Sequence, residues 1–212
     1  MKYKCVIFDC DGVLVDTEHI SIGTLVSMGN ELGAALDFEF AMVHFLGKSL
    51  EYCFRYIEAR CTKPFPNDFE KQYRAVSFEK FKNELQPIEG IKELIEKLNV
   101  PFCVASNGPL NKMKLNLQTV GLDSAFGTNM FSAYDINKFK PDPALFLYAA
   151  ETLGFTPEEC VVIEDSDVGV KAAIAGGFDV FGFANPRSES LLKDAGANLF
   201  YHMNELSELL DL

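Results

Sequence analysis

The sequence lacks the cysteine and histidine spacings of zinc sites and disulfide frameworks. Its six cysteines are scattered, with no CxxC pair and no histidine at zinc-finger spacing. They are Cys5, Cys10, Cys53, Cys61, Cys103 and Cys160. We therefore expect reduced thiols, as in a cytoplasmic protein, and we expect Cys10 to be an ordinary packed side chain.

Long apolar runs are also missing. The first one, CVIF at 5–8, stops at Asp9, which is too short for the core of a signal peptide, and no stretch approaches the length of a membrane-spanning helix. Repeats and low-complexity segments are absent, and the composition of 48% hydrophobic and 24% charged residues is typical of a soluble globular protein. We expect a chain that is folded throughout, with no membrane partner.

Basic residues are few compared with acidic ones. The chain has 19 lysines and arginines against 31 aspartates and glutamates, a formal charge of -12 that repels nucleic-acid phosphates. A small anionic ligand gains no long-range attraction either, so a phosphate site must build local positive potential from a metal ion, a lysine and helix amides. We expect a small-molecule partner, no nucleic acid, and a monomer or weak homo-oligomer.

Strand and helix patterns alternate along most of the chain. Short apolar, partly β-branched runs predict strands at 3–8, 101–106, 160–165, 179–183 and, more weakly, 197–201. Between them, apolar residues at helical spacing predict helices at 91–98, 110–120 and 143–153. This alternation predicts an α/β fold, with a Rossmann-like parallel sheet that carries helices on both faces.

Residues 17–85 break the alternation. They show helical periodicity and capping residues, Asp37 and Ser49, without a convincing buried strand. We predict an inserted small helical cap domain at 17–85 and a catalytic core formed by 1–16 and 86–212. The active site should lie at the carboxyl ends of the core strands, where open α/β sheets bind ligands.

Two acidic residues follow the first predicted strand directly, in the segment DCDGVLVD at 9–16. Asp9 and Asp11 occupy alternate positions, so both can face one site, and Gly12 allows the backbone to turn sharply. In phosphoryl transfer, such a pair supplies a carboxylate nucleophile and a second carboxyl that exchanges a proton with the leaving or attacking oxygen. The alternative is that both are ordinary acidic turn residues.

A second acidic segment, Glu164-Asp165-Ser166, ends another predicted strand and precedes a helix of small residues. Asp165 or Ser166 can simply cap that helix. Together with Asp9 and Asp11, however, up to four carboxylates would converge, and they would repel one another unless a divalent cation neutralised them. Oxygen ligands suit Mg²⁺, so we predict a magnesium site at these four acids.

A hydroxyl and a lysine can complete a phosphate site. Ser106 and Asn107 join a predicted strand to a helix, where the hydroxyl and the free amides can bind phosphate oxygens; a plain loop cap is the alternative. Lys140 lies in the stiff segment KPDP at a helix entrance, which suits a fixed positive charge near the nucleophile. An exposed lysine would be the ordinary expectation.

The set DCDGVLVD, SN, KPDP and IEDS, in that order, resembles the four motifs of the haloacid dehalogenase (HAD) superfamily, from the first to the fourth predicted strand. The helical insert resembles the small mobile cap of its β-phosphoglucomutase-like subfamily. The resemblance implies that Asp9 is a nucleophile that forms an aspartyl-phosphate. It also implies that Asp11 is the acid/base, with its backbone carbonyl on Mg²⁺.

Further roles follow from the same resemblance. Ser106 and Lys140 would contact the transferring phosphoryl group, and Asp165, with Glu164, would bind the metal. The segments 106–115 and 130–150 are similar to a bacterial branch that includes 6-phosphogluconate phosphatase.

The substrate should therefore be a small phosphorylated metabolite, such as a sugar phosphate of this kind. Gly47-Lys48-Ser49 resembles the cap loop that selects the substrate in this subfamily. We predict Asn107, Gly47 and Lys48 as substrate-binding residues.

Several other functions remain as alternatives. A sugar phosphomutase shares the aspartyl-phosphate chemistry, but Ser106-Asn107-Gly108 departs from the serine-lysine-asparagine pattern of β-phosphoglucomutase. A dehalogenase would lack the second acid, here Asp11. A receiver-type signalling module also has an acidic Mg²⁺ pocket and a phosphorylated aspartate, but it has no helical insert of this size. An inactive binding protein would not need both Asp9 and Asp11.

Overall fold

The computed structural model describes residues 2–46 and 48–212. The chain forms two compact units, one made of Met1–Val15 and Gln86–Leu212 and the other of Asp16–Leu85. The first boundary between the two units lies between Val15 and Asp16. The boundary expected from the sequence, between residues 16 and 17, is one residue later. We refer to the two units as the core unit and the helical unit.

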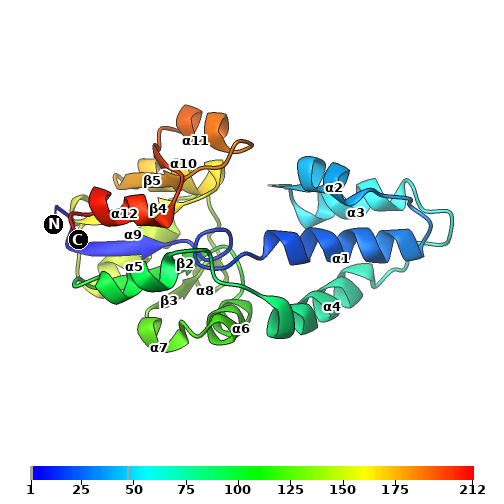
Figure 1. Cartoon of the computed structure of the whole chain (residues 1–212), viewed down its shortest axis with the longest axis horizontal. Helices are drawn as coiled ribbons and strands as arrows, with labels where there is room; N and C mark the ends of the chain where they lie inside the picture. Colours follow the sequence, from blue (N-terminus) through cyan, green and yellow to red (C-terminus); the bar gives the residue numbers. More distant parts are fainter. Residues whose placement is uncertain (1, 47) are drawn as a thin grey trace. The chain divides into compact units, whose positions relative to one another are not determined.

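A six-stranded parallel sheet forms the centre of the core unit, in the order β3-β2-β1-β4-β5-β6 (Figure 1). The strands are β1 Cys5–Phe8, β2 Phe102–Ser106, β3 Met130–Ser132, β4 Cys160–Glu164, β5 Asp179–Phe183 and β6 Asn198–Phe200. The predicted α/β fold is confirmed. Strand β3 was not predicted, because three residues at the sheet edge are too few to show a strand period.

Helices cover both faces of the sheet. They are α5 Ile91–Lys97, α6 Leu110–Val120, α7 Asp123–Phe126, α8 Ala133–Ile136, α9 Ala144–Leu153, α10 Asp167–Ala175, α11 Glu189–Ala195 and α12 Met203–Leu209, with a 3-10 turn η1 at Pro157–Glu159. Alternate residues of β1 face opposite sides: Cys5 and Ile7 join the cluster that includes α9 and α10, whereas Phe8 packs against Phe126 of α7. Burial on both faces explains why the strands are continuously apolar.

The strand order brings three strand ends together. In the register of the sheet, Phe8 of β1 lies beside Val104 of β2 and Ile163 of β4. Because all strands are parallel, the segments that follow β1, β2 and β4 leave the sheet at the same side, the carboxyl ends of the strands. Asp9, which follows β1, and Glu164, the last residue of β4, therefore lie at the ends of neighbouring strands.

The helical unit contains α1 Glu18–Glu31, α2 Phe38–Phe45, α3 Leu50–Glu58 and α4 Phe69–Glu84. The two predicted caps are confirmed: Asp37 accepts a hydrogen bond from Phe40 N at 2.9 Å, and Ser49 accepts one from Tyr52 N at 3.2 Å. Buried apolar residues of the four helices form one cluster, which includes Leu25. The described residues of this unit form no strand.

The cysteines form no disulfide among the described residues. All six cysteines are free, and burial raises the pKa of the Cys10 thiol well above its usual value, so this thiol stays neutral.

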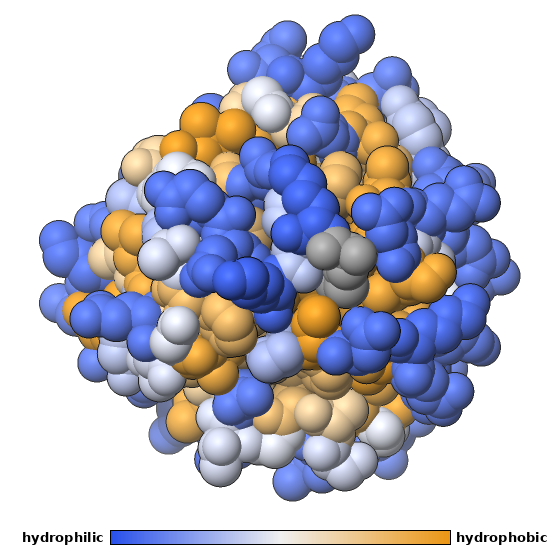
Figure 2. Space-filling model, turned by 90° about the vertical axis from the view of Figure 1, so that its left-hand side faces the viewer, coloured by the Kyte–Doolittle hydropathy of each residue, from blue (hydrophilic) through white to orange (hydrophobic). Residues whose placement is uncertain are grey.

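Hydrophilic and hydrophobic side chains are interspersed on the face shown in Figure 2. Within the described part of the chain, no helix combines the length and apolar character that crossing a bilayer requires.

Candidate active site

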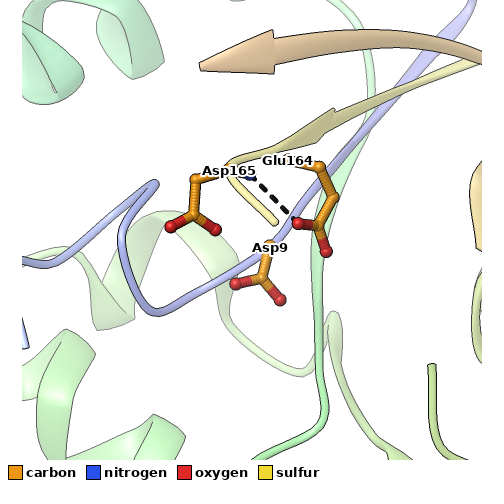
Figure 3. Close-up of side chains that lie close together, drawn as sticks. All are labelled: Asp9, Glu164 and Asp165. Carbon is orange, nitrogen blue, oxygen red and sulfur yellow. Dashed lines mark hydrogen bonds between the residues drawn. The ribbon is translucent and has the colours of Figure 1, made fainter. Parts of the chain in front are cut away.

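Three carboxylates converge where β1 and β4 end. Asp9 follows β1, Glu164 is the last residue of β4, and Asp165 comes next; each offers an oxygen within 4.8 Å of the others (Figure 3). In Figure 3, Asp9 lies between the other two side chains. Four converging side chains were expected, but Asp11 directs its carboxylate elsewhere, so three form this cluster.

Two glycines allow the chain to close tightly on the cluster. Gly12 adopts a φ of +82°, and a Cβ there would lie 2.0 Å from Asp165 Oδ2. A Cβ on Gly169, in α10, would lie 1.8 Å from Glu164 Oε1. Any larger residue would push one of the two carboxylates away, so the two glycines are needed for the packing of the cluster.

Lys140 is buried within the cluster. Its Nζ lies 2.5 Å from Asp9 Oδ1 and 2.7 Å from Glu164 Oε1, and it donates to Ala105 O at 2.9 Å. The side chain is 2% exposed, so the alternative of a surface lysine is excluded. Burial alone lowers the pKa of Lys140, but the two carboxylates outweigh it and raise the pKa above its ordinary value. The ammonium group therefore stays charged.

The second oxygen of Glu164 binds the start of α10. Glu164 Oε2 accepts hydrogen bonds from Asp165 N and Ser166 N, both at 3.0 Å, and from Ser166 Oγ at 2.8 Å. Ser166 Oγ in turn accepts from Gly169 N at 3.1 Å. Ser166 is thus the N-cap of α10, and the Asp165 carboxylate lies in the cluster with Asp9 and Glu164.

Two residues that were not predicted as site residues from the sequence bind Asp11. Lys112 Nζ lies 2.6 Å from Asp11 Oδ2, and Asn116 Nδ2 donates to Asp11 Oδ1 at 3.3 Å. Both residues come from α6. One signal was present in the sequence: Asn116 is a polar residue on the apolar stripe of this helix, between Met113 and Val120. Polar residues at such positions usually have a specific partner.

The site fits a divalent cation. Burial raises the pKa of Asp9 to about 7; Glu164 adds to the effect, and Lys140 opposes it. The four carboxylates Asp9, Asp11, Glu164 and Asp165, with the two ammonium groups of Lys112 and Lys140, leave a formal charge of -2. Oxygen ligands with this excess charge match a hard cation such as Mg²⁺.

Ser106 and Asn107 have hydrogen bonds within the protein in this structure. Ser106 Oγ accepts from Gly108 N at 3.0 Å, which is the loop-cap arrangement, and Asn107 Oδ1 accepts from Lys140 N at 2.8 Å. Lys48 is exposed, and Gly47 lies outside the described residues. Contacts of these residues with phosphate or substrate remain predictions.

A comparison with protein families shows to which family the chain belongs. The family model for haloacid dehalogenase-like hydrolases matches residues 3–177. The chain belongs to this family. The resemblance recognised from the four motifs is therefore confirmed, and the receiver-type alternative is excluded. The predicted enzyme class, a HAD-type phosphatase, is also confirmed, because similar proteins are named as phosphatases.

Similar proteins match this HAD hydrolase over nearly its full length. It is 35% identical to 6-phosphogluconate phosphatase of Escherichia coli over 210 residues, which are 98% of this chain and 95% of the relative. A haloacid dehalogenase-like protein of unknown function from Agrobacterium tumefaciens has a TM-score of 0.88 at 28% identity, covering 99% and 98% of the two chains. A HAD family hydrolase from Deinococcus radiodurans, solved with phosphate and sodium, has a TM-score of 0.85 at 29% identity, covering 99% and 96%.

Proposed function

We propose that the protein is a cytoplasmic, Mg²⁺-dependent phosphatase of a small sugar phosphate, which acts through an aspartyl-phosphate on Asp9. The observation that supports this most directly is the position of Asp9. Its carboxylate is buried at the end of β1, next to the Lys140 ammonium and within 4.8 Å of oxygens of Glu164 and Asp165. A nucleophilic carboxylate beside a fixed cation and an acidic metal cluster is what phosphoryl transfer to an aspartate requires.

The proposed reaction has two steps. In the first, an oxygen of Asp9 attacks phosphorus, the bond between phosphorus and the ester oxygen breaks, and Asp11 gives its proton to the departing alcohol. In the second, water attacks the phosphorus of the aspartyl-phosphate. Asp11 takes the proton from this water, inorganic phosphate leaves, and Asp9 is regenerated.

The other residues of the site stabilise charge. The Lys140 ammonium would offset the negative charge of the phosphoryl group, and Ser106 with the first amides of α6 would bind its oxygens. Asp9, Glu164, Asp165 and the backbone carbonyl of Asp11 would hold Mg²⁺, which when bound neutralises the carboxylates and the phosphoryl oxygens. This assignment leaves Asp11 as the group that moves protons.

The substrate class rests on the similar proteins. The relative that is 35% identical is named for 6-phosphogluconate, and its match extends over 98% of this chain. The similar hydrolase from D. radiodurans was solved with bound phosphate. We therefore propose 6-phosphogluconate as the first compound to test.

We expect purified protein to release phosphate from sugar phosphates in the presence of Mg²⁺, and we expect a chelator to abolish this turnover. The reason is the charge of the site, since the acidic cluster repels an anionic substrate unless a cation neutralises it. The measurement is phosphate release across a panel of sugar and nucleotide phosphates, first with Mg²⁺, then with excess chelator, then after Mg²⁺ is added back.

Two outcomes would contradict the proposal. Full activity in excess chelator would exclude metal dependence. Conversion of β-glucose 1-phosphate to glucose 6-phosphate, faster than phosphate appears, would favour the phosphomutase alternative.

The loop between α2 and α3 is proposed to select the substrate, because it resembles the specificity loop of the subfamily and contains the exposed Lys48. Replacing Lys48 with alanine should raise KM for the preferred sugar phosphate, or change the ranking of substrates, more than it affects p-nitrophenyl phosphate. Lys71→Ala, which removes another exposed lysine of the helical unit, is the matched control. An equal loss on every substrate would contradict a role in selection.

A further inference from the structure

Two donors on α6 bind the two oxygens of Asp11 separately. Lys112 Nζ lies 2.6 Å from Oδ2, and Asn116 Nδ2 donates to Oδ1 at 3.3 Å. The two donors are four residues apart, so they lie on the same face of the helix. Asp11 itself lies in the loop after β1. One contact on each oxygen restrains both the position and the rotation of the carboxylate.

Neither donor occupies a position that favours α6 itself. Lys112 lies in the first turn, where the helix dipole disfavours a positive charge. Asn116 is fully buried, and its Oδ1 has no hydrogen-bond partner among residues 2–46 and 48–212. A buried acceptor without a partner lowers stability, and an apolar residue there would avoid this loss. The contacts with Asp11 account for both residues better than helix stability does.

The bound carboxylate lies beside the loop that follows β2. A Cβ on Gly108 would lie 3.8 Å from Asp11 Oδ2, 3.8 Å from Lys112 Cδ and 3.4 Å from Ser106 Oγ. Asp11, Lys112 and Ser106 therefore border one small space at Gly108. Ser106 is the residue proposed to bind the phosphoryl group, so Asp11 Oδ2 lies near the place proposed for that group.

We infer that Lys112, together with Asn116, is a positioning residue that keeps the carboxylate of Asp11 against the 106–108 loop for proton transfer. This inference rests on the proposed function. The ammonium group also offsets the repulsion between Asp11 and the three-carboxylate cluster, which includes Asp9 only two residues away. Without the two donors, the Asp11 carboxylate would lose a contact on each of its oxygens, and fewer molecules would hold it in the position needed for proton transfer.

The test uses the full chain with Mg²⁺ and compares Lys112→Met with Lys114→Met. Both changes remove one lysine charge from α6, but Lys114 is exposed and serves as the matched control. For the sugar phosphate that the wild type hydrolyses fastest, Lys112→Met should lower kcat by about 10- to 100-fold with KM nearly unchanged, since positioned acid/base catalysis is typically worth about 10² to 10⁴. Lys112→Arg should recover most of this loss, because a guanidinium can also donate to the carboxylate.

Leaving-group dependence separates positioning from a general structural effect. With p-nitrophenyl phosphate, the initial burst of nitrophenolate needs no proton from Asp11, so Lys112→Met should keep the rate of this burst. Asn116→Leu should lower kcat on the sugar phosphate without lowering the melting temperature, because it removes an unpaired buried acceptor.

Several results would overturn the inference. Equal kcat for Lys112→Met and Lys114→Met would do so, as would an equal loss in the nitrophenolate burst. A rise in KM alone would assign Lys112 to substrate binding instead. Any of these three results with an active wild type leaves the proposed function intact, whereas a wild type that releases no phosphate from any ester overturns the proposed function and this inference with it.

Discussion

Asp9→Asn is expected to lower phosphatase activity by about 10⁴- to 10⁶-fold, the scale seen when an enzyme loses its nucleophile. The amide cannot form an acyl phosphate, so covalent labelling by substrate should disappear as well. The variant should remain folded, because the change removes one of three carboxylates that crowd within 4.8 Å. Phosphate release and rapid-mix mass spectrometry would measure the two effects.

Asp11→Asn is the comparison that separates the two aspartates. It should lower turnover of a sugar phosphate by about 10² to 10⁴, yet it should still form the phosphoenzyme from p-nitrophenyl phosphate, whose leaving group hardly needs a proton. The phosphoenzyme on Asp9 should then accumulate, because water attack lacks its base. A phosphorylated Asp9→Asn protein, or undiminished turnover of the sugar phosphate by Asp11→Asn, would contradict the assigned roles.

Lys140→Met is expected to lower the free energy of unfolding by about 3–5 kcal/mol in metal-free buffer, the usual result of removing one partner of a buried ion pair. The methionine fills similar space but leaves Asp9 and Glu164 without the ammonium that now lies 2.5 Å and 2.7 Å from them. Urea denaturation in the presence of a chelator would measure the change.

Lys138→Met provides the control, since Lys138 is exposed and its ion pair with Asp142 spans 3.4 Å. Its loss should change the free energy of unfolding by less than about 0.5 kcal/mol. If Lys140→Met were as stable as Lys138→Met, the buried ion pairs of Lys140 would not stabilise the fold.

Many elements of both units could be predicted from the sequence because their signals are local. The apolar runs before Asp9 and at 160–164 are strands, and α6 begins and ends where its apolar spacing and Gly121 indicated. The caps at Asp37 and Ser49 depend only on the next few residues, and they were predicted correctly. Strand β3 was missed because a three-residue edge strand has almost no local signal.

The partners of the site residues depend on residues far apart in the chain. Lys140 is 131 positions from Asp9, and no local pattern distinguishes it from an exposed lysine such as Lys138. Lys112 lies 101 positions from Asp11, and no local pattern distinguishes it from Lys114, an exposed lysine of the same helix. Each pair depends on the packing of distant segments: Lys140, before α9, lies against Asp9 after β1, and Lys112 of α6 lies against Asp11 in the loop after β1.

By itself, the sequence determined which residue types are available to form the site and which strand each of them follows. The reason is that a strand, the turn after it and the cap of the next helix depend on neighbouring residues. It thereby determined the α/β fold and the positions of Asp9, Asp11, Glu164 and Asp165 along the chain. Only the tertiary structure decided which carboxylates share a cluster, that Lys140 is buried between two of them, and that α6 binds Asp11. Burial and long-range pairing set these interactions, since both the desolvation of a charge and its partner depend on the packing of distant segments.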